Sequence, residues 1–313
     1  MRKVTKKSDW TLSDIPDLSG KQALVTGVTS GLGSQTVLEL VRHGARVVMA
    51  ARSDSKLRHT IEEIRRVQPD ADLVPLIVDL ADLGSVRRAA DEVSSLGALD
   101  ILVNNAGVMA TPHRRTVDGF ELQFGTNHLG HFALTGLLFP LLAKAQAARV
   151  VTVASQAHRM VRSVPVEDPR NDQRRYRKWI SYAESKLANL LFAFELDRRA
   201  REAGSNVSSM AAHPGYAATN LFSGINLGGS KPDGAIVVAA SRLLAQPSSM
   251  GAQPTLMAAT MPGLPGGSYV GPRGPGEMRG TPTLVTPSRA ARNEDLARQL
   301  WQVSEEATRV YFP

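Results

Sequence analysis

Apolar and polar residues follow two different spacings along the chain up to residue 215. Short runs rich in β-branched residues predict strands, and longer runs with apolar residues every three or four positions predict helices. The predicted strands are QALVTG (22–27), ARVVMAA (45–51), DLVPLIVDL (72–80), LDILVNNAG (99–107), ARVVTVAS (148–155) and NVSSMAAHPG (206–215). The predicted helices lie near 32–43, 54–67, 83–96, 119–145 and 180–203. This alternation predicts an α/β fold, a Rossmann-type, doubly wound parallel sheet flanked by helices, with its ligand beyond the carboxyl ends of the strands.

Two stretches depart from this alternation. Residues 159–179 have no clear period and are rich in basic residues, so we expect an inserted basic surface loop there. Residues 262–276 alternate proline and glycine around one short strand candidate, GSYV, which predicts a rigid connection near the end of the sheet. Without a linker that divides the chain, we expect a single domain over 19–313, preceded by a basic arm over 1–18.

The composition narrows the class of protein. The chain has 313 residues, of which 42% are hydrophobic and 21% charged, as expected of a globular protein with a large core. It has no cysteine, which excludes disulfides, thiol catalysis and cysteine zinc sites. The longest apolar stretch, 132–143, is too short for a bilayer, and no apolar run follows the basic N-terminus. We therefore expect a cytoplasmic protein without a transmembrane segment.

The formal net charge of +8 belongs to two segments rather than to the whole chain. Residues 1–7 and 170–178 each contribute four net positive charges, and the remaining 28 basic and 28 acidic residues balance. Neither segment has the interleaved aromatic residues of a nucleic-acid surface beyond Tyr176 and Trp179. We therefore expect a small-molecule substrate and no nucleic-acid partner, with a homo-oligomer remaining possible.

A glycine-rich turn, TGVTSGLG, connects the first strand to the first helix. Gly27 permits a sharp turn, Gly31 lets a pyrophosphate approach the backbone, and Gly33 lets the helix lie close to the sheet. A glycine triplet alone is weak evidence, but the strand before it and the helix after it supply the required context. We predict a dinucleotide site formed by Gly27, Thr29, Ser30, Gly31, Leu32 and Gly33.

The ends of the next strands add candidate cofactor contacts. Arg52 stands where NAD-binding proteins usually place an acidic residue, and an arginine there can bind a 2′-phosphate, which favours NADP while leaving NAD possible. Asp79, beside Leu80, could contact adenine or cap the following helix, as Asp82 could. After the fourth strand, a polar turn or a space for the cofactor is expected at Asn105, Ala106 and Gly107.

The candidate chemistry lies further along the chain. Tyr182 and Lys186 are four residues apart on a predicted helix, and a nearby ammonium favours the phenolate form of a tyrosine. Tyr182 is therefore a candidate acid/base, and Lys186 could also bond the nicotinamide ribose. Ser155 could hold a substrate oxygen or cap a helix. Asn127 could hold a water that relays protons from Lys186, or be a buried structural amide.

Together these residues resemble the short-chain dehydrogenase/reductase family over nearly the whole chain, from TGVTSGLG through NNAG and YAESK to HPGYAATN (213–220). The resemblance implies a catalytic tetrad of Asn127, Ser155, Tyr182 and Lys186. It also implies that the nicotinamide is flanked by Pro214, Gly215 and Thr219. The segments NHLGHFALT and SKLANLLFAFEL are similar to the retinol-dehydrogenase-like and protochlorophyllide-reductase-like branch, and WTLSDIPDLSGKQALVTG to its soluble actinobacterial members.

The expected activity is an NADP-preferring hydride transfer that interconverts an alcohol and a carbonyl. Apolar residues in the segment 216–234 predict a substrate loop that closes over an apolar compound, although a partly buried loop would show the same pattern. Reduction of a C=C bond also occurs in the similar branch and is one alternative. A cofactor-sensing regulator of the same fold is the other. His128, His131 and His158 lack metal-ligand spacing, so no metal site is expected.

Overall fold

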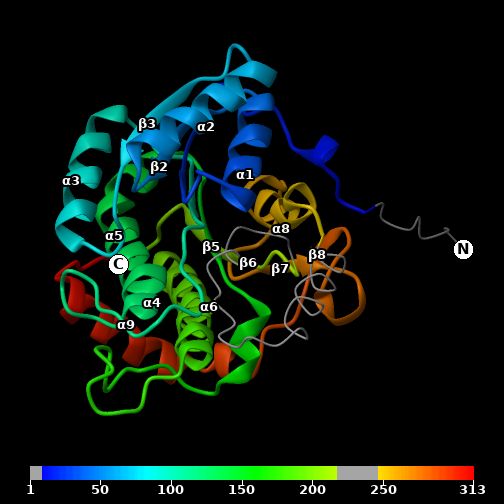
Figure 1. The fold of residues 1–313 in the computed structure, drawn as a ribbon. Coiled ribbons are helices and arrows are strands. Elements are labelled where there is room, and N and C mark those ends of the chain that lie inside the picture. The colour runs from blue at the N-terminus through cyan, green and yellow to red at the C-terminus, as the bar shows by residue number, and fades with distance from the viewer. Residues whose placement is uncertain (1–8, 217–245) are drawn as a thin grey trace, which may run out of the picture.

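The computed structural model describes residues 9–216 and 246–313. Their strands form one eight-stranded sheet in the order β3-β2-β1-β4-β5-β6-β7-β8, in which every neighbouring pair is parallel except β7 and β8 (Figure 1). This confirms the predicted α/β, Rossmann-type sheet. The strands are β1 (Gln22–Thr26), β2 (Arg46–Ala51), β3 (Leu73–Ile77), β4 (Ile101–Asn104), β5 (Ala148–Val153), β6 (Val207–Ala212), β7 (Tyr269–Pro272) and β8 (Pro282–Leu284).

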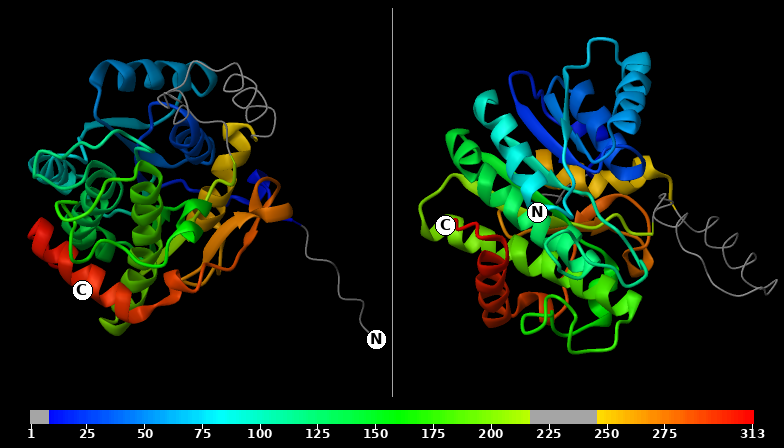
Figure 2. Two further views of the ribbon diagram at one scale, coloured as in Figure 1. Left: turned by 60° about the horizontal axis from the view of Figure 1, so that its bottom comes forward. Right: turned by 60° about the vertical axis from the view of Figure 1, so that its left-hand side comes forward.

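Helices cover both faces of this sheet (Figure 2). The longer helices are α1 (Gly31–Arg42), α2 (Asp54–Val67), α3 (Leu83–Val93), α5 (Gly130–Lys144), α6 (Lys178–Glu202), α8 (Ser248–Thr260) and α9 (Glu294–Thr308). Alternate strand residues point to opposite faces. Val25 packs into a core with α1, α2 and α8, whereas its neighbour Leu24 packs into a second core with α3, α5 and α6. The strands β1, β2, β4 and β5 are therefore mostly apolar, because both of their faces are buried, whereas the edge strand β3 exposes Pro75 and Ile77.

The helix predicted over 119–145 is divided. A short helical turn, α4 (Leu122–Phe124), is followed by a wider π-helical turn, η3 (Gly125–Leu129), and only then by α5. Asn127 lies in the π-helical turn, where its side chain bonds the main chain of Val108. A local widening of this kind often occurs where a side chain has a function outside the helix.

The basic loop predicted over 159–179 is shorter than expected, because a 3₁₀ turn, η4 (Gln156–Met160), precedes it and α6 begins at Lys178. It is also docked on the rest of the chain. Both guanidinium nitrogens of Arg174 bond the carboxylate of Glu184, at 2.5 and 2.7 Å. The guanidinium of Arg170 lies 4.7 Å from the centre of the Phe120 ring. These two cations are therefore occupied by partners within the chain.

The segments near the two ends of the described chain pack against its middle. Trp10, in the segment expected to be a basic arm, is buried in the core around α1 and α8. The carboxylate of Asp9 pairs with Arg273 and accepts a hydrogen bond from the Thr281 hydroxyl at 3.1 Å. At the other end, Trp301 of α9 stacks on Phe192 of α6. The four basic residues expected in the arm lie outside the described residues. None of the described helices is both long and apolar enough to cross a bilayer.

Candidate active site

The glycine-rich turn after β1 lies close to the main chain that follows β4. A Cβ on Gly27 would lie 2.7 Å from the Cα of Ala106, and a Cβ on Gly33 would collide with the carbonyl oxygen of Gly27. Gly27 and Gly31 also have φ angles of 71° and 62°, which side chains disfavour. The turn therefore requires glycine for its close contacts and its backbone conformation.

The first turn of α1 presents its N–H groups at this edge of the sheet. Ser30, the residue before the helix, is extended, and its hydroxyl forms no capping hydrogen bond. Unpaired N–H groups at a helix N-terminus attract an anion. Thr29 and Leu32 are partly exposed at this turn, and Ser30 is exposed. The glycine contacts and the uncapped helix thus fit a diphosphate held against the turn.

The segment that follows β4 is fixed to the end of β1. The Thr26 hydroxyl oxygen accepts hydrogen bonds from the N–H groups of Asn105 and Ala106, both at 2.9 Å. The Asn105 amide in turn donates to the Thr26 carbonyl at 2.7 Å. His131 of α5 bonds the same hydroxyl through Nε2 at 2.9 Å. Asn105 is thus used to hold the backbone, which leaves the small residues Ala106 and Gly107 partly exposed at the edge.

Arg52 and Asp79 follow the neighbouring strands β2 and β3. The end of β2 joins the glycine turn through a hydrogen bond from Gly27 N to Ala50 O at 2.9 Å. Arg52 is exposed, and among the residues that the structure describes its guanidinium has no partner. Asp79 accepts a hydrogen bond from Ala81 N at 2.9 Å, while the helix-capping role belongs to Asp82, which accepts from Ser85 N.

Leu80 belongs to the packing of this region. Its side chain is buried, and a Cβ on Gly130 would collide with its carbonyl oxygen. α5 therefore begins directly against the segment that follows β3. This contact explains a glycine at the first position of a largely apolar helix.

Tyr182 and Ser155 meet at the carboxyl end of β5. Tyr182 is 6% exposed, and its hydroxyl lies close enough to the Ser155 hydroxyl for Ser155 to affect its pKa. Burial raises the pKa of Tyr182 to about 12, although the Ser155 side chain acts in the opposite direction. The Ser155 hydroxyl also accepts from Ala157 N at 3.2 Å and so caps η4. Ser155 therefore combines the capping role with a position beside the phenol.

Lys186 lies on the same face of α6 as Tyr182. Its ammonium nitrogen is 5.9 Å from the centre of the Tyr182 ring and donates to the carbonyl of Val153 at 3.0 Å. Burial lowers the pKa of Lys186 to about 8. Burial is therefore the dominant influence on the pKa of both groups, raising that of Tyr182 and lowering that of Lys186.

Asn127 is fully engaged by its surroundings. Its Oδ1 accepts from Val108 N at 2.7 Å, and its Nδ2 donates to Val108 O and to the Ser185 hydroxyl, both at 2.9 Å. Ser185 then donates to the carbonyl of Tyr182 at 2.8 Å. A Cβ on Gly107 would lie 3.1 Å from Asn127 Oδ1 and 3.6 Å from Lys186 Nζ. The structure thus brings all four expected catalytic residues to one part of the molecule, where the Asn127 side chain is bonded to the main chain of Val108 and to Ser185.

Pro214 and Gly215 follow β6 at the same edge and are partly exposed. Gly215 has a φ of 66°, and a Cβ there would collide with the carbonyl oxygen of Met278. Of the substrate loop predicted over 216–234, only Tyr216 is described. Thr219 lies outside the described residues.

Sequence reasoning did not single out Trp179 as a site residue. It stands one helical turn before Tyr182 on α6, its ring lies 6.4 Å from the Tyr182 ring at 83°, and it is 37% exposed. An exposed indole beside a buried phenol offers an apolar surface to a bound molecule. Its spacing of three residues from Tyr182 could have indicated this position.

The described residues contain no group of three or more histidine, aspartate or glutamate side chains that could hold a metal ion. The candidate histidines bond protein groups instead. His128 bonds the Ser304 hydroxyl at 2.8 Å, His131 bonds Thr26, and His158 donates to the Ser155 carbonyl at 2.7 Å. These histidines therefore have structural roles.

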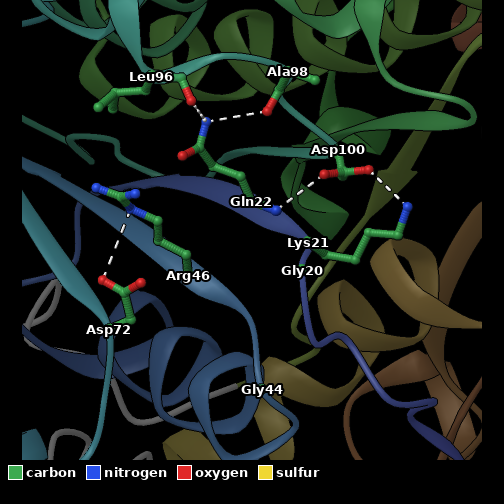
Figure 3. Close-up of a pocket in the computed structure, with 9 residues that line it drawn as sticks. All are labelled: Gly20, Lys21, Gln22, Gly44, Arg46, Asp72, Leu96, Ala98 and Asp100. Carbon is green, nitrogen blue, oxygen red and sulfur yellow. Dashed lines mark hydrogen bonds and ion pairs between the residues drawn. The ribbon is translucent and has the colours of Figure 1, made fainter.

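A polar cavity of about 420 Å³ lies at the opposite, amino-terminal edge of the sheet (Figure 3). Lys21 and Asp100 form an ion pair of 2.9 Å in its wall, and Gln22 donates to the carbonyls of Leu96 and Ala98. The polar groups in its wall are bonded to one another. Because the cavity lies at the amino-terminal edge and the catalytic residues at the carboxyl edge, the two sites are separate.

Known proteins similar to this chain include a family of oxidoreductases and several solved structures. Residues 21–167 match the protein family described as short chain dehydrogenase. Retinol dehydrogenase 13 of Homo sapiens is 36% identical over 288 residues, covering 92% of this chain and 84% of that protein. The crystal structure of an uncharacterised protein from Mycobacterium paratuberculosis is 42% identical, with a TM-score of 0.79 and coverage of 98% of this chain and 100% of that one.

A further solved structure shares the fold at lower identity. It is assigned as an NAD(P)-dependent gluconate 5-dehydrogenase from Beutenbergia cavernae and contains NADP at low occupancy. It is 23% identical, with a TM-score of 0.61, and covers 78% of this chain and 91% of that one.

Proposed function

The chain belongs to the short-chain dehydrogenase/reductase family and is an NAD(P)-dependent oxidoreductase, and we propose that it prefers NADP and interconverts an alcohol and a carbonyl on an apolar small molecule. The observation that carries this proposal is the meeting of Tyr182, Ser155 and Lys186 beside the segment around Gly107. Gly107 follows β4, Ser155 follows β5, and Tyr182 and Lys186 lie on α6, at the edge where the glycine turn can hold a diphosphate.

The bound nicotinamide cofactor supplies or accepts the hydride. In the direction of reduction, Ser155 would hold the substrate oxygen by a hydrogen bond, and Tyr182 would donate its phenolic proton to the oxygen of the carbonyl that the cofactor's hydride reduces. The pKa of Tyr182, raised to about 12 by burial, keeps the phenol protonated at neutral pH. Oxidation runs the same transfers in reverse, with the phenolate taking the proton.

Lys186 and Asn127 support this exchange in different ways. The Lys186 ammonium, held by the Val153 carbonyl, stabilises the phenolate that remains after proton transfer. Asn127 fixes Val108 and, through Ser185, the backbone of Tyr182. In this proposal Asn127 holds Val108, next to Gly107, at a fixed distance from the backbone of Tyr182.

The preference for NADP rests on Arg52. Arg52 is exposed and follows β2, whose residue Ala50 is bonded to Gly27 of the glycine turn, and no described group neutralises its guanidinium. An arginine can form paired, charge-assisted hydrogen bonds with a phosphate. A carboxylate in its place would repel the 2′-phosphate that distinguishes NADP from NAD.

An apolar substrate is supported by Trp179, whose partly exposed ring lies against Tyr182. The test of this proposal is a panel of apolar and charged ketones, aldehydes, secondary alcohols and enones assayed with NADP(H) and NAD(H). We expect turnover of apolar carbonyl compounds and a higher kcat/KM with NADPH than with NADH. If only enones are turned over, the reaction is C=C reduction and not carbonyl reduction. If only charged compounds are turned over, the proposal of an apolar substrate is wrong.

A further inference from the structure

A buried histidine, His213, connects the segment Pro214–Gly215 to the carboxylate of Glu277. His213 follows β6, immediately before Pro214, and its side chain is fully buried. Its Nδ1 accepts a hydrogen bond from Gly215 N at 3.2 Å, so the ring proton lies on Nε2. Nε2 donates to Oε2 of Glu277 at 2.9 Å. The conformation of the His213–Gly215 segment is therefore tied to Glu277, 64 residues further along the chain.

The same carboxylate receives donors from the other side of the site. Gln156, the residue after Ser155, donates from Nε2 to the same oxygen of Glu277. Arg159 lies 3.4 Å from the other carboxylate oxygen and also donates to Oε1 of Gln156 at 2.7 Å. The hydrogen bond from His213 lowers the pKa of Glu277, so its carboxylate is ionised at neutral pH. Glu277 is thus a common acceptor for the segments that follow β5 and β6.

The loop that carries Glu277, residues 273–280, also holds the main chain beyond Gly215. Tyr216 N donates to Met278 O at 2.7 Å, and Gly280 N donates to Oε1 of Gln246 at 3.2 Å. The Gln246 amide donates to Pro214 O at 2.6 Å. The loop therefore contacts the described chain on both sides of the segment 217–245.

Glu277 occupies an unfavourable backbone conformation. Its φ is 56°, in the left-handed region that side chains disfavour, and Gly276 beside it has a φ of 60°. A glycine at 277 would relieve this strain but would leave His213 and Gln156 without their acceptor. The cost of the conformation is offset by the three donors around the carboxylate.

We propose that Glu277 is a positioning residue that fixes the distance between Ser155 and the Pro214–Gly215 segment. This inference rests on the proposed function, in which Ser155 holds the substrate oxygen, and on the position of Pro214–Gly215 beside the nicotinamide that the family resemblance implies. The carboxylate joins the two segments through Gln156 and His213. Its loss would therefore let the Pro214–Gly215 segment move relative to Ser155. Displacements of about 1 Å in such a geometry cost about 100-fold in rate.

The test compares E277A, E277Q and R279A. The Arg279 side chain is exposed on the same loop, so R279A is the matched control. We expect E277A to weaken NADPH binding and to lower kcat by about tenfold or more each, as the loss of a hydrogen-bonded charge predicts. E277Q keeps an oxygen that accepts from His213 and should recover part of both losses. R279A should match the wild type.

Two results would overturn the proposal. One is an E277A protein whose NADPH dissociation constant and kcat stay within about twofold of the wild type. The other is an equal loss in R279A, which would assign the effect to the loop as a whole. If E277A does not fold, E277Q decides: unchanged NADPH binding and kcat in E277Q overturns the proposal, and an intermediate loss with an unchanged melting temperature supports it. NADPH binding, followed by the fluorescence of the reduced nicotinamide, needs no substrate, so a negative substrate panel leaves this test decisive.

Discussion

The Lys186 ammonium lies 5.9 Å from the centre of the Tyr182 ring and donates to the Val153 carbonyl. The two side chains share one face of α6, yet burial raises the pKa of one to about 12 and lowers the pKa of the other to about 8. At neutral pH this pair therefore holds a protonated phenol beside an ammonium. Such a pair is prepared to donate a proton, which suits the reduction of a carbonyl.

Replacing Tyr182 with phenylalanine removes the donor without changing the packing of the ring. We expect kcat to fall by about 100-fold or more, because positioned acid/base groups contribute factors of this size. The dissociation constant of NADPH should change little. Tyr311→Phe is the matched control, since that ring is 67% exposed and remote in sequence from α6. Turnover at the wild-type rate in Tyr182→Phe would refute the assigned mechanism.

Replacing Arg52 with alanine should weaken the binding of NADPH much more than that of NADH. A hydrogen-bonded charge pair contributes about 1.5–3 kcal/mol, so we expect NADPH to bind about 10- to 100-fold more weakly. NADH, which has no 2′-phosphate, should bind almost as before. Titration of both cofactors measures this, with Arg58→Ala as the control because Arg58 pairs with Asp54 on α2. Equal losses for NADPH and NADH would show that Arg52 does not recognise the 2′-phosphate.

Replacing Trp179 with alanine tests the apolar substrate surface. Removing the indole should raise KM for bulky apolar carbonyl compounds by about tenfold, given the area that an aromatic ring buries. KM for a compact substrate and the binding of NADPH should stay close to the wild-type values. Steady-state kinetics with a bulky and a small ketone make the comparison. The same change in KM for both substrates would argue against a contact between Trp179 and the substrate.

The buried histidines predict a loss of stability in acid. Burial lowers the pKa of His128 to about 3 and those of His131 and His158 to about 4, so all three are neutral in the folded protein. The unfolded chain binds more protons below its ordinary histidine pKa of about 6.5. Stability is therefore full above that pH and falls as the pH is lowered toward 4, by about 1.4 kcal/mol per pH unit for each histidine.

Urea unfolding at several pH values measures this slope. His128→Gln removes one titrating group and should reduce the slope by about 1.4 kcal/mol per pH unit. His59→Gln is the control, because the His59 side chain is 64% exposed on α2. A slope in His128→Gln equal to that of the wild type would exclude His128 as a source of the acid sensitivity.

The sheet and much of the site could be predicted because their residues belong to patterns that are local in the sequence. Strands buried on both faces appear as apolar runs, and parallel pairing brings their carboxyl ends to one edge. This places Gly27, Arg52, Gly107, Ser155 and Pro214 together without knowledge of any side-chain contact. Tyr182 and Lys186 follow from helical spacing, which α6 confirms.

Other features have no local pattern. α8 is buried along nearly all of its length and contains Pro254, so it lacks the alternation that identifies a surface helix. The start of α9, by contrast, has a sequence signal. Asn293 accepts a hydrogen bond from Leu296 N and precedes two acidic residues, Glu294 and Asp295, as is typical of a helix N-terminus. The pairs Arg174–Glu184 and His213–Glu277 depend on tertiary contacts, and no spacing along the chain predicts them.

The contact of Asp9 with Arg273 and Thr281 spans almost the whole chain. Closing a loop of 264 residues costs conformational entropy before any contact compensates for it. Asp9 is synthesised long before Arg273 and Thr281, so this contact can form only after the segments around β7 and β8 have been made. The contact of this first described residue is therefore among the last that the growing chain can make, and contacts between residues so far apart in sequence tend to slow folding.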